Sequence, residues 1–228
     1  MYSKLNSYTG NKNNYNVLNT IRNTEQQYND FIISNMKYGV KKQKKIYPYF
    51  KHFIKFLENH NIVYFLVRGS LLGCIRTGKS IAWDDDFDIY INTTEMQKLL
   101  NMSIQENSMK YTIEINNYKW TVTKNTYGFY QISTQDIKVT DIFNEKDNWY
   151  KKSVNPQGPP IRKQFHDILC NVGKNYHDEL TFYYGKNYLK DYVLANHKLN
   201  SGHTYYHKDE YKYIHLDKLE YEKYLKYI

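Results

Sequence analysis

The chain has 228 residues, enough for one domain with a hydrophobic core of its own. Its two cysteines exclude a disulfide scaffold and suit a reducing compartment, and no apolar run is long enough to predict a transmembrane helix. The net charge is +9, and Tyr, Asn, Lys and Ile are abundant, a composition typical of an AT-rich genome, cellular or viral. This bias explains the positive charge more simply than attraction to a polyanion, so we expect no nucleic-acid partner.

The N-terminal part is polar and then becomes helical. Residues 1–25 are rich in Asn, which predicts a flexible arm, and they lack the apolar core of a signal peptide, so we expect a cytoplasmic protein. Apolar residues then recur at helical spacing over residues 28–60, which predicts one or two helices broken near Gly39. The lysines of this segment are expected to form a solvated helix face, with a nucleic-acid patch as the alternative.

A strand and a glycine turn follow. Residues 62–67 form a continuous apolar run, which predicts a buried strand. Gly69 and Ser70 then turn the chain into a short helix over residues 70–76, and the backbone N–H groups and positive dipole end of such a turn favour phosphate. We predict that Ser70 adds its hydroxyl group, and that Arg76 contacts a phosphate oxygen or neutralises a nearby aspartate.

Residues 73–80, Gly-Cys-Ile-Arg-Thr-Gly-Lys-Ser, match G-x-x-x-x-G-K-[ST], the phosphate-binding loop of many NTPases. That loop requires a strand running into its first glycine and a long helix starting at its Lys-Ser pair. Here the strand ends near Val67 and acidic residues follow soon after Ser80, which leaves no room for such a helix. We therefore interpret the match as a coincidence.

Four carboxylates then lie within five positions, at Asp84, Asp85, Asp86 and Asp88. Like charges this close raise one another's pKa, and a divalent metal is the simplest compensation. Apolar, β-prone residues surround Asp86 and Asp88, which predicts a strand with both side chains on one face. Two such oxygens suit Mg²⁺, which fills its other positions with water and substrate phosphates. We expect Asp84 and Asp85 to orient water or Arg76.

The middle of the chain alternates between turn residues and apolar segments. Thr94 and Gln97 match a capping box, which predicts a helix to about residue 104. Strands are predicted at residues 111–115, 120–124 and 129–133, separated by Asn-rich breaks as in a β-meander. A further strand is predicted at residues 137–143.

The C-terminal part carries weaker signals. Residues 153–162 are rich in Pro and Gly, which predicts a loop or lid. The spacing of His166, Cys170 and His177 fits no familiar zinc ligand set, so we expect structural roles for them. The tail from residue 205 has apolar residues near helical spacing and is expected to pack back on the domain.

The motif from residue 69 to residue 88 resembles the LicD family, which includes the fukutin-related proteins, within the nucleotidyltransferase-fold superfamily. Members carry Gly-Thr-Leu-Leu-Gly-Ala-x-Arg followed by Ile-Pro-Trp-Asp-Asp-Asp-x-Asp; this chain has Gly-Ser-Leu-Leu-Gly-Cys-Ile-Arg and Ile-Ala-Trp-Asp-Asp-Asp-Phe-Asp. Departures from the pattern occur at Arg68, Ser70, Cys74, Lys79 and Ala82. A later x-Asp-Ile-Phe strand and a Tyr-Gly pair extend the resemblance to about residues 44–190.

The resemblance implies an α/β fold of the nucleotidyltransferase type, a mixed β-sheet flanked by helices, with extra N- and C-terminal helices in a single domain over residues 26–228. It implies that Asp86, Asp88 and Asp141 are the catalytic carboxylates and hold Mg²⁺ or Mn²⁺. Asp141, in the x-Asp-Ile-Phe strand, takes the place of the third carboxylate, as a metal ligand or as the general base. The turn at Gly69 binds substrate.

The activity that the resemblance implies is transfer of a phosphorylated alcohol, such as phosphocholine or a polyol phosphate, from a CDP-linked donor to a glycan hydroxyl, with release of CMP. One alternative is a nucleotidyltransferase that moves the NMP group itself. Another is an inactive domain that binds nucleotide or nucleic acid, against which the intact set of three carboxylates argues.

Overall fold

The computed structural model describes residues 5–6, 25–115, 117–126, 128–135, 137–144, 156, 158–195 and 213–228. The predicted N-terminal arm lies almost entirely outside these residues. Of the loop or lid predicted at residues 153–162, the structure describes residues 156 and 158–162, and residues 161 and 162 belong to a strand. The chain forms two compact units. The first unit consists of Met1–Lys41, Ala82–Asp84 and Asn187–Ile228, and the second consists of Lys42–Ile81 and Asp85–Lys186.

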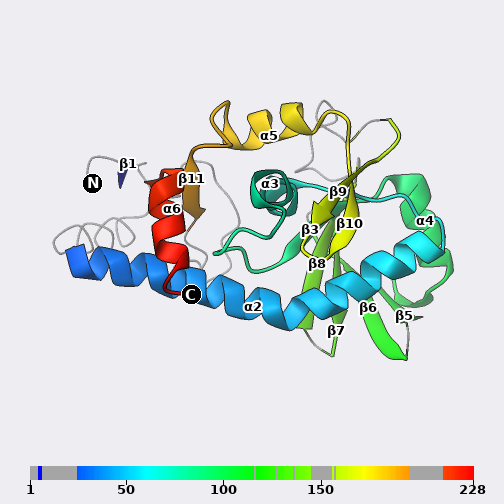
Figure 1. Ribbon diagram of the computed structural model, residues 1–228. Helices are drawn as coiled ribbons and strands as arrows, with labels where there is room; N and C mark the ends of the chain where they lie inside the picture. Colours follow the sequence, from blue (N-terminus) through cyan, green and yellow to red (C-terminus); the bar gives the residue numbers. More distant parts are fainter. Residues whose placement is uncertain are drawn as a thin grey trace. The chain divides into compact units, whose positions relative to one another are not determined.

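A seven-stranded sheet forms the centre of the second unit, in the order β2-β3-β8-β7-β6-β5-β4 (Figure 1). The strands β3 and β8 run parallel and the other neighbours run antiparallel, so the sheet is mixed, as predicted. The strands are β2 (Phe65–Leu66), β3 (Phe87–Tyr90), β4 (Ile104–Asn107), β5 (Lys110–Ile115), β6 (Tyr118–Lys124), β7 (Tyr130–Thr134) and β8 (Ile137–Phe143). The predicted meander is thus present as β5 to β7, and the strand predicted at residues 137–143 is β8, whereas β4 was not predicted.

One continuous helix, α2 (Glu25–Asn59), forms where one or two helices were predicted, so the expected break near Gly39 is wrong. The position requires glycine because the backbone of Ala82 and Trp83 passes so close that a Cβ atom would collide with it. The glycine therefore permits close packing within the first unit and does not end the helix. None of the described helices, α2 included, combines the length and the apolar character needed to cross a lipid bilayer.

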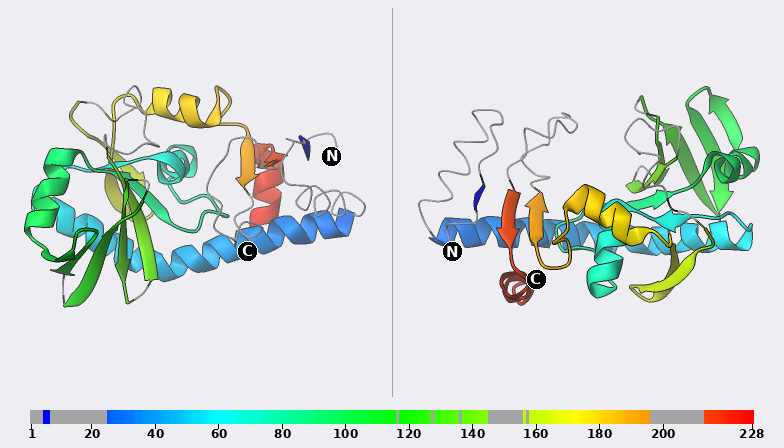
Figure 2. Two further views of the ribbon diagram at one scale, coloured as in Figure 1. Left: turned by 180° about the vertical axis from the view of Figure 1, so that it is seen from behind. Right: turned by 90° about the horizontal axis from the view of Figure 1, so that it is seen from above.

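The second half of α2 packs on the sheet of the second unit (Figure 2). Phe50 stacks on Phe87 of β3 with 4.0 Å between ring centroids, and Phe53 stacks on Trp120 of β6 at 5.7 Å. All four rings are fully buried. Burial of such aromatic side chains contributes strongly to the stability of the core.

Three further helices and a hairpin complete this unit. α3 (Arg68–Thr77) confirms the predicted short helix, and α4 (Thr93–Asn101) follows β3. The N-cap of α4 is Asn92, whose side chain accepts a hydrogen bond from the Glu95 N–H, so the capping box predicted at Thr94 is wrong. The hairpin of β9 (Ile161–Phe165) and β10 (Ile168–Val172) was not predicted. It leads to α5 (Tyr176–Tyr184), which ends at Gly185.

The first unit contains a small antiparallel sheet and a C-terminal helix. The sheet has the order β1-β12-β11, formed by β1 (Leu5–Asn6), β12 (Tyr213–Leu216) and β11 (Tyr192–Ala195). The helix α6 (Lys218–Leu225) begins at a capping box formed by Asp217 and Glu220. Tyr221 of α6 packs edge-to-face on Trp83, with 5.2 Å between ring centroids, and its hydroxyl oxygen accepts a 3.0 Å hydrogen bond from the Ala82 N–H.

Gly73 tests the packing of α3. A Cβ atom at this position would collide with the carbonyl oxygen of Lys79, because the loop after α3 folds back against the helix. Gly73→Ala is therefore expected to destabilise the protein by about 1–3 kcal/mol through overpacking, whereas an unconstrained helical Gly→Ala change stabilises. Chemical denaturation measures this, with Lys55→Ala on the exposed face of α2 as the control. A Gly73→Ala variant as stable as wild type would show that the loop does not pack this closely.

Candidate metal and phosphate site

Two parallel strands bring three carboxylates together. Asp88 of β3 is the register partner of Asp141 in β8, and Asp86 comes just before β3. One carboxylate oxygen from each of Asp86, Asp88 and Asp141 lies within 4.8 Å of the others. Phe87 lies between Asp86 and Asp88 in the sequence, and its side chain faces α2. Because side chains alternate along a strand, Asp86 and Asp88 point to the opposite face of the sheet. The sequence predicted this shared face for Asp86 and Asp88.

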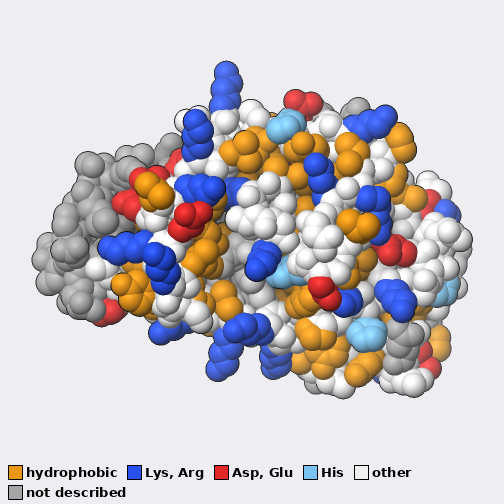
Figure 3. Space-filling model, in the orientation of Figure 1, with side chains coloured by type: hydrophobic (Ala, Val, Ile, Leu, Met, Phe, Trp, Pro, Cys, Tyr) orange, Lys and Arg blue, Asp and Glu red, His pale blue; other side chains and the backbone are white. Residues whose placement is uncertain are grey.

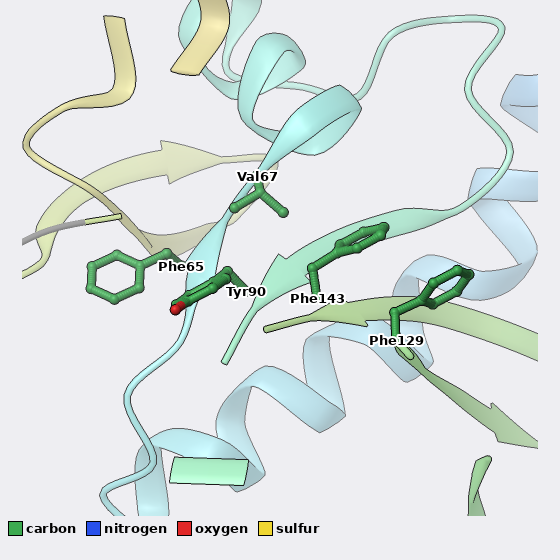
Figure 4. Packing of buried hydrophobic residues seen from close by; sticks show 5 residues of the cluster. All are labelled: Phe65, Val67, Tyr90, Phe129 and Phe143. Carbon is green, nitrogen blue, oxygen red and sulfur yellow. The ribbon is translucent and has the colours of Figure 1, made fainter. Parts of the chain in front are cut away.

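An apolar cluster lies at the ends of the same two strands (Figure 4). Tyr90 and Phe143 each lie two residues beyond Asp88 and Asp141, at the ends of β3 and β8. The cluster is completed by Phe65, Val67 and Phe129. The five side chains of the cluster are buried, so the apolar core reaches this face of the sheet.

Asp141 is the most buried of the three acids, with 8% of its surface exposed. Burial raises the pKa of its carboxyl group to about 6, a shift that the positive charge of Lys138 opposes and the negative charge of Asp86 reinforces. The amide of Gln131, on β7, donates a hydrogen bond of 3.1 Å to Asp141 Oδ1. This carboxyl group is thus held in one orientation and titrates close to neutral pH.

Lys138 is the positive charge that the sequence analysis missed. Its Nζ atom lies 2.6 Å from Asp86 Oδ2 and 3.0 Å from Asp141 Oδ2. Both carboxylates raise the pKa of Lys138 and so hold it charged, against the opposing effect of its burial. The like-charge repulsion expected from the sequence is therefore partly offset by a side chain of the protein itself.

A β-bulge explains why Lys138 was missed. In a regular strand, residues three apart point to opposite faces, so the lysine three residues before an acid is expected on the far side of the sheet. Here Ser133 pairs with Lys138 and the next residue, Ile132, pairs with Thr140, so β8 contains one extra residue between the two pairs. The extra residue shifts the alternation and brings the lysine to the acidic face, a common use of bulges at functional sites.

The glycine turn is bonded directly to the acidic strand. The Ser70 hydroxyl accepts a 2.9 Å hydrogen bond from the Asp88 N–H, and the Val67 N–H donates to the Asp88 carbonyl oxygen at 3.2 Å. Ser70 is buried, with 1% of its surface exposed. Gly69 lies beside it in the first turn of α3. The predicted phosphate-binding turn and the predicted metal-binding strand are therefore one rigid assembly.

The start of α3 is fixed by a buried acid from α5. Arg68 has a positive φ of 47°, and its N–H donates a 3.1 Å hydrogen bond to Glu179 Oε1. Glu179 is 2% exposed. The Arg68 guanidinium lies 4.1 Å from the ring centroid of Phe143 and 5.2 Å from that of Tyr183. Sequence reasoning found no role for Glu179, because its partner is 111 residues away in the chain.

The other predicted residues have less defined places. Arg76 is half-buried in the last turn of α3, and Asp85 is half-buried just before β3. Asp84 belongs to the first unit and is mostly buried. Their predicted roles in substrate binding and support remain predictions.

The motif at residues 73–80 is not a nucleotide-binding loop. Gly73 lies inside α3, Gly78 caps the end of that helix in the left-handed conformation, and no helix follows in the described stretch before Thr93. Ser80 instead binds His166, with 3.1 Å from its N–H to Nε2. Among the described residues, no group of three metal-ligating side chains includes this histidine, Cys170 or His177.

The donor atoms at the acidic face fit a hard divalent cation. Three carboxylates supply only oxygen, the ligand type that Mg²⁺ and Mn²⁺ take in proteins. Asp86 and Asp88 are half-buried and Asp141 is buried. The fold and this site together define a nucleotidyltransferase-type α/β domain with a Gly-Ser turn, an Asp-x-Asp strand and a third Asp on the neighbouring strand.

Comparison with known proteins shows a similarity to one family. Residues 61–167 match the family model described as LicD/FKTN/FKRP, nucleotidyltransferase domain, and the matched range contains the turn, Asp86, Asp88 and Asp141. Over 60 residues the chain is 37% identical to the lipopolysaccharide cholinephosphotransferase LicD of Haemophilus influenzae. That stretch covers 26% of this chain and 23% of the relative. Residues 61–167 are thus similar to the LicD/FKTN/FKRP family, and the chain spans about a quarter of the length of this relative.

Ser70 offers a test of the bonded turn. Ser70→Ala removes the acceptor of the Asp88 N–H and leaves that buried donor without this bond, so we expect a loss of about 1–3 kcal/mol in the free energy of unfolding. Ser70→Thr keeps the hydroxyl group and is the matched control. Chemical denaturation in EDTA measures both. Equal stability of the alanine variant and wild type would mean that the bond does not join α3 to β3.

Proposed function

We propose that this domain transfers a phosphorylated alcohol, phosphocholine or a polyol phosphate, from a CDP-linked donor to a hydroxyl group of a glycan, with Mg²⁺ or Mn²⁺ bound. The observation that carries the proposal is the convergence of Asp86, Asp88 and Asp141 beside the turn at Ser70. The name of the Haemophilus influenzae relative supports transfer of phosphocholine. The family description supports the nucleotide part of the donor.

The residues of the chain have distinct tasks in this reaction. Asp86 and Asp88 hold the metal, and the N–H groups of the turn at Gly69 and Ser70 orient the donor phosphates. When bound, Mg²⁺ neutralises the negative charge that develops on the transferred phosphate. Asp141 either completes the metal ligands or accepts the proton of the attacking hydroxyl group. Its pKa of about 6 suits the second task, because a general base works best when its pKa is near the operating pH.

The bond changes balance without another reactant. The acceptor oxygen forms a bond to the phosphorus atom that carries the alcohol, and the bond between that phosphorus and the bridging oxygen breaks. The leaving group is CMP, which takes the electron pair, and the hydroxyl proton passes to a base such as Asp141. The products are CMP and a glycan phosphodiester.

Two alternatives remain open to test. A nucleotidyltransferase would use the same carboxylates but release pyrophosphate from an NTP, and the fold hosts both chemistries. An inactive nucleic-acid-binding domain would call for a continuous basic surface. On the face shown in Figure 3, Lys and Arg are for the most part separated by uncharged and hydrophobic side chains.

The activity test separates these cases and the roles of the acids. Wild type is incubated with Mg²⁺, a glycan acceptor and either CDP-choline, CDP-ribitol or an NTP, and release of CMP and pyrophosphate is followed. We expect CMP release from a CDP-linked donor, abolished in Asp86→Asn and Asp88→Asn. Lys79→Ala, in the exposed loop after α3, is the control and should retain activity. Pyrophosphate release without CMP release would favour the nucleotidyltransferase.

Asp141→Asn is expected to separate catalysis from donor binding. If Asp141 acts mainly as the base, kcat falls strongly while Mg²⁺-dependent thermal stabilisation by CDP-choline persists. The same titration on Asp86→Asn should show weaker stabilisation, because that variant lacks a ligand of the metal that bridges to the phosphates. Full activity in Asp141→Asn would remove this residue from the site.

The pH dependence of metal binding gives an independent check. The raised pKa of Asp141 means that its carboxyl group is largely protonated below about pH 6, and a proton must leave before the oxygen can bind metal. The Kd for Mn²⁺ should therefore rise as the pH falls through about 6, well above the range in which an ordinary aspartate titrates. In Asp141→Asn this step should be absent. Titration of free Mn²⁺ by electron paramagnetic resonance measures both proteins.

A further inference from the structure

Lys138 stands where the metal of the proposed function would bind. Its ammonium group bridges Asp86 Oδ2 and Asp141 Oδ2 at 2.6 and 3.0 Å, and those carboxylates belong to the group whose oxygens lie within 4.8 Å of one another. A tethered cation of the protein and a free divalent cation thus share the same ligands. They repel each other, so one must leave when the other binds.

The charges of the site favour exchange over permanent occupation. Three carboxylates face one ammonium group, so the site keeps a net negative charge with Lys138 in place and still attracts a divalent cation. The Lys138 side chain is 37% exposed, which gives its end a path into solvent. The bulge in β8 nevertheless fixes its base on the acidic face, so the ammonium group cannot move far from the site.

Once the metal has displaced it, the ammonium group of Lys138 requires another anion to balance its charge. In the loaded site of the proposed function, the anions nearest to the metal are the donor phosphates, and a lysine ammonium binds phosphate as a compact point charge. The turn at Ser70, where those phosphates are expected, is bonded to the same strand as Asp88.

We propose that Lys138 is a substrate-binding residue that exchanges partners: it neutralises Asp86 and Asp141 in the metal-free protein, is displaced by the divalent cation, and then contacts the phosphate oxygens of the donor. This inference rests on the proposed function for the identity of the donor, but not for the exchange itself. A purely structural ion pair would behave differently, because its loss would distort the carboxylates and weaken metal binding.

The first experiment measures metal binding without nucleotide. The Kd for Mn²⁺ is determined by electron paramagnetic resonance for wild type, Lys138→Met and Lys119→Met, the last being a control on an exposed lysine of β6. A neighbouring positive charge lowers the proton affinity of a carboxylate by about tenfold or more. We expect Lys138 to lower the affinity of the carboxylates for Mn²⁺ by a similar factor, so the Kd for Mn²⁺ should be about tenfold lower in Lys138→Met than in wild type. An unchanged or higher Kd would overturn the exchange. Lys138→Gln replaces Lys138→Met if the methionine variant does not fold.

The second experiment measures phosphate binding at saturating Mn²⁺. Calorimetric titration with CDP-choline and with inorganic pyrophosphate should show weaker binding to Lys138→Met than to wild type, with partial recovery in Lys138→Arg. Equal affinities of wild type and Lys138→Met for both probes would overturn the phosphate contact. If wild type binds pyrophosphate but not CDP-choline, the proposed donor is wrong, while the pyrophosphate comparison still decides the role of Lys138.

Discussion

Electrostatic repulsion among three carboxylates is the constraint on which the site depends. Two parallel strands place Asp88 opposite Asp141, and Asp86 stands at the start of the same strand pair. Three such groups within 4.8 Å of one another repel, and a compensating positive charge lowers the free energy of this arrangement. The structure provides part of that charge through Lys138, and under the proposed function a divalent cation would provide the rest.

The packing behind the site makes this arrangement rigid. On one face of the sheet, Phe87 is buried against Phe50 of α2, and on the other the apolar cluster around Phe143 closes the side of the acids. Because Phe87 lies between Asp86 and Asp88, its burial fixes the direction in which both acids point. The bond from the Asp88 N–H to Ser70 then ties the glycine turn to the same strand. Binding elements that do not have to be ordered on arrival of the substrate lose less entropy.

A contact between Arg68 and Glu179 shows how α5, which is distant in the sequence, fixes the backbone at the start of the Gly69-Ser70 turn. The strained backbone of Arg68 is supported by a buried carboxylate from α5, and the guanidinium of Arg68 rests on Phe143. These contacts shape the surface next to the predicted phosphate position.

The sequence by itself determined the local parts of the protein: the short helix after the glycine turn, the alternating strands of the meander, and the shared face of Asp86 and Asp88. Each follows from residues only a few positions apart, where the periodicity of strands and helices applies directly. Tertiary structure decided the rest. Gly39 lies within a continuous helix because a distant backbone passes beside it, and Lys138 reaches the acids because pairing with β7 produces a bulge in β8. Such features depend on which segments become neighbours, and no local pattern of residues records that choice.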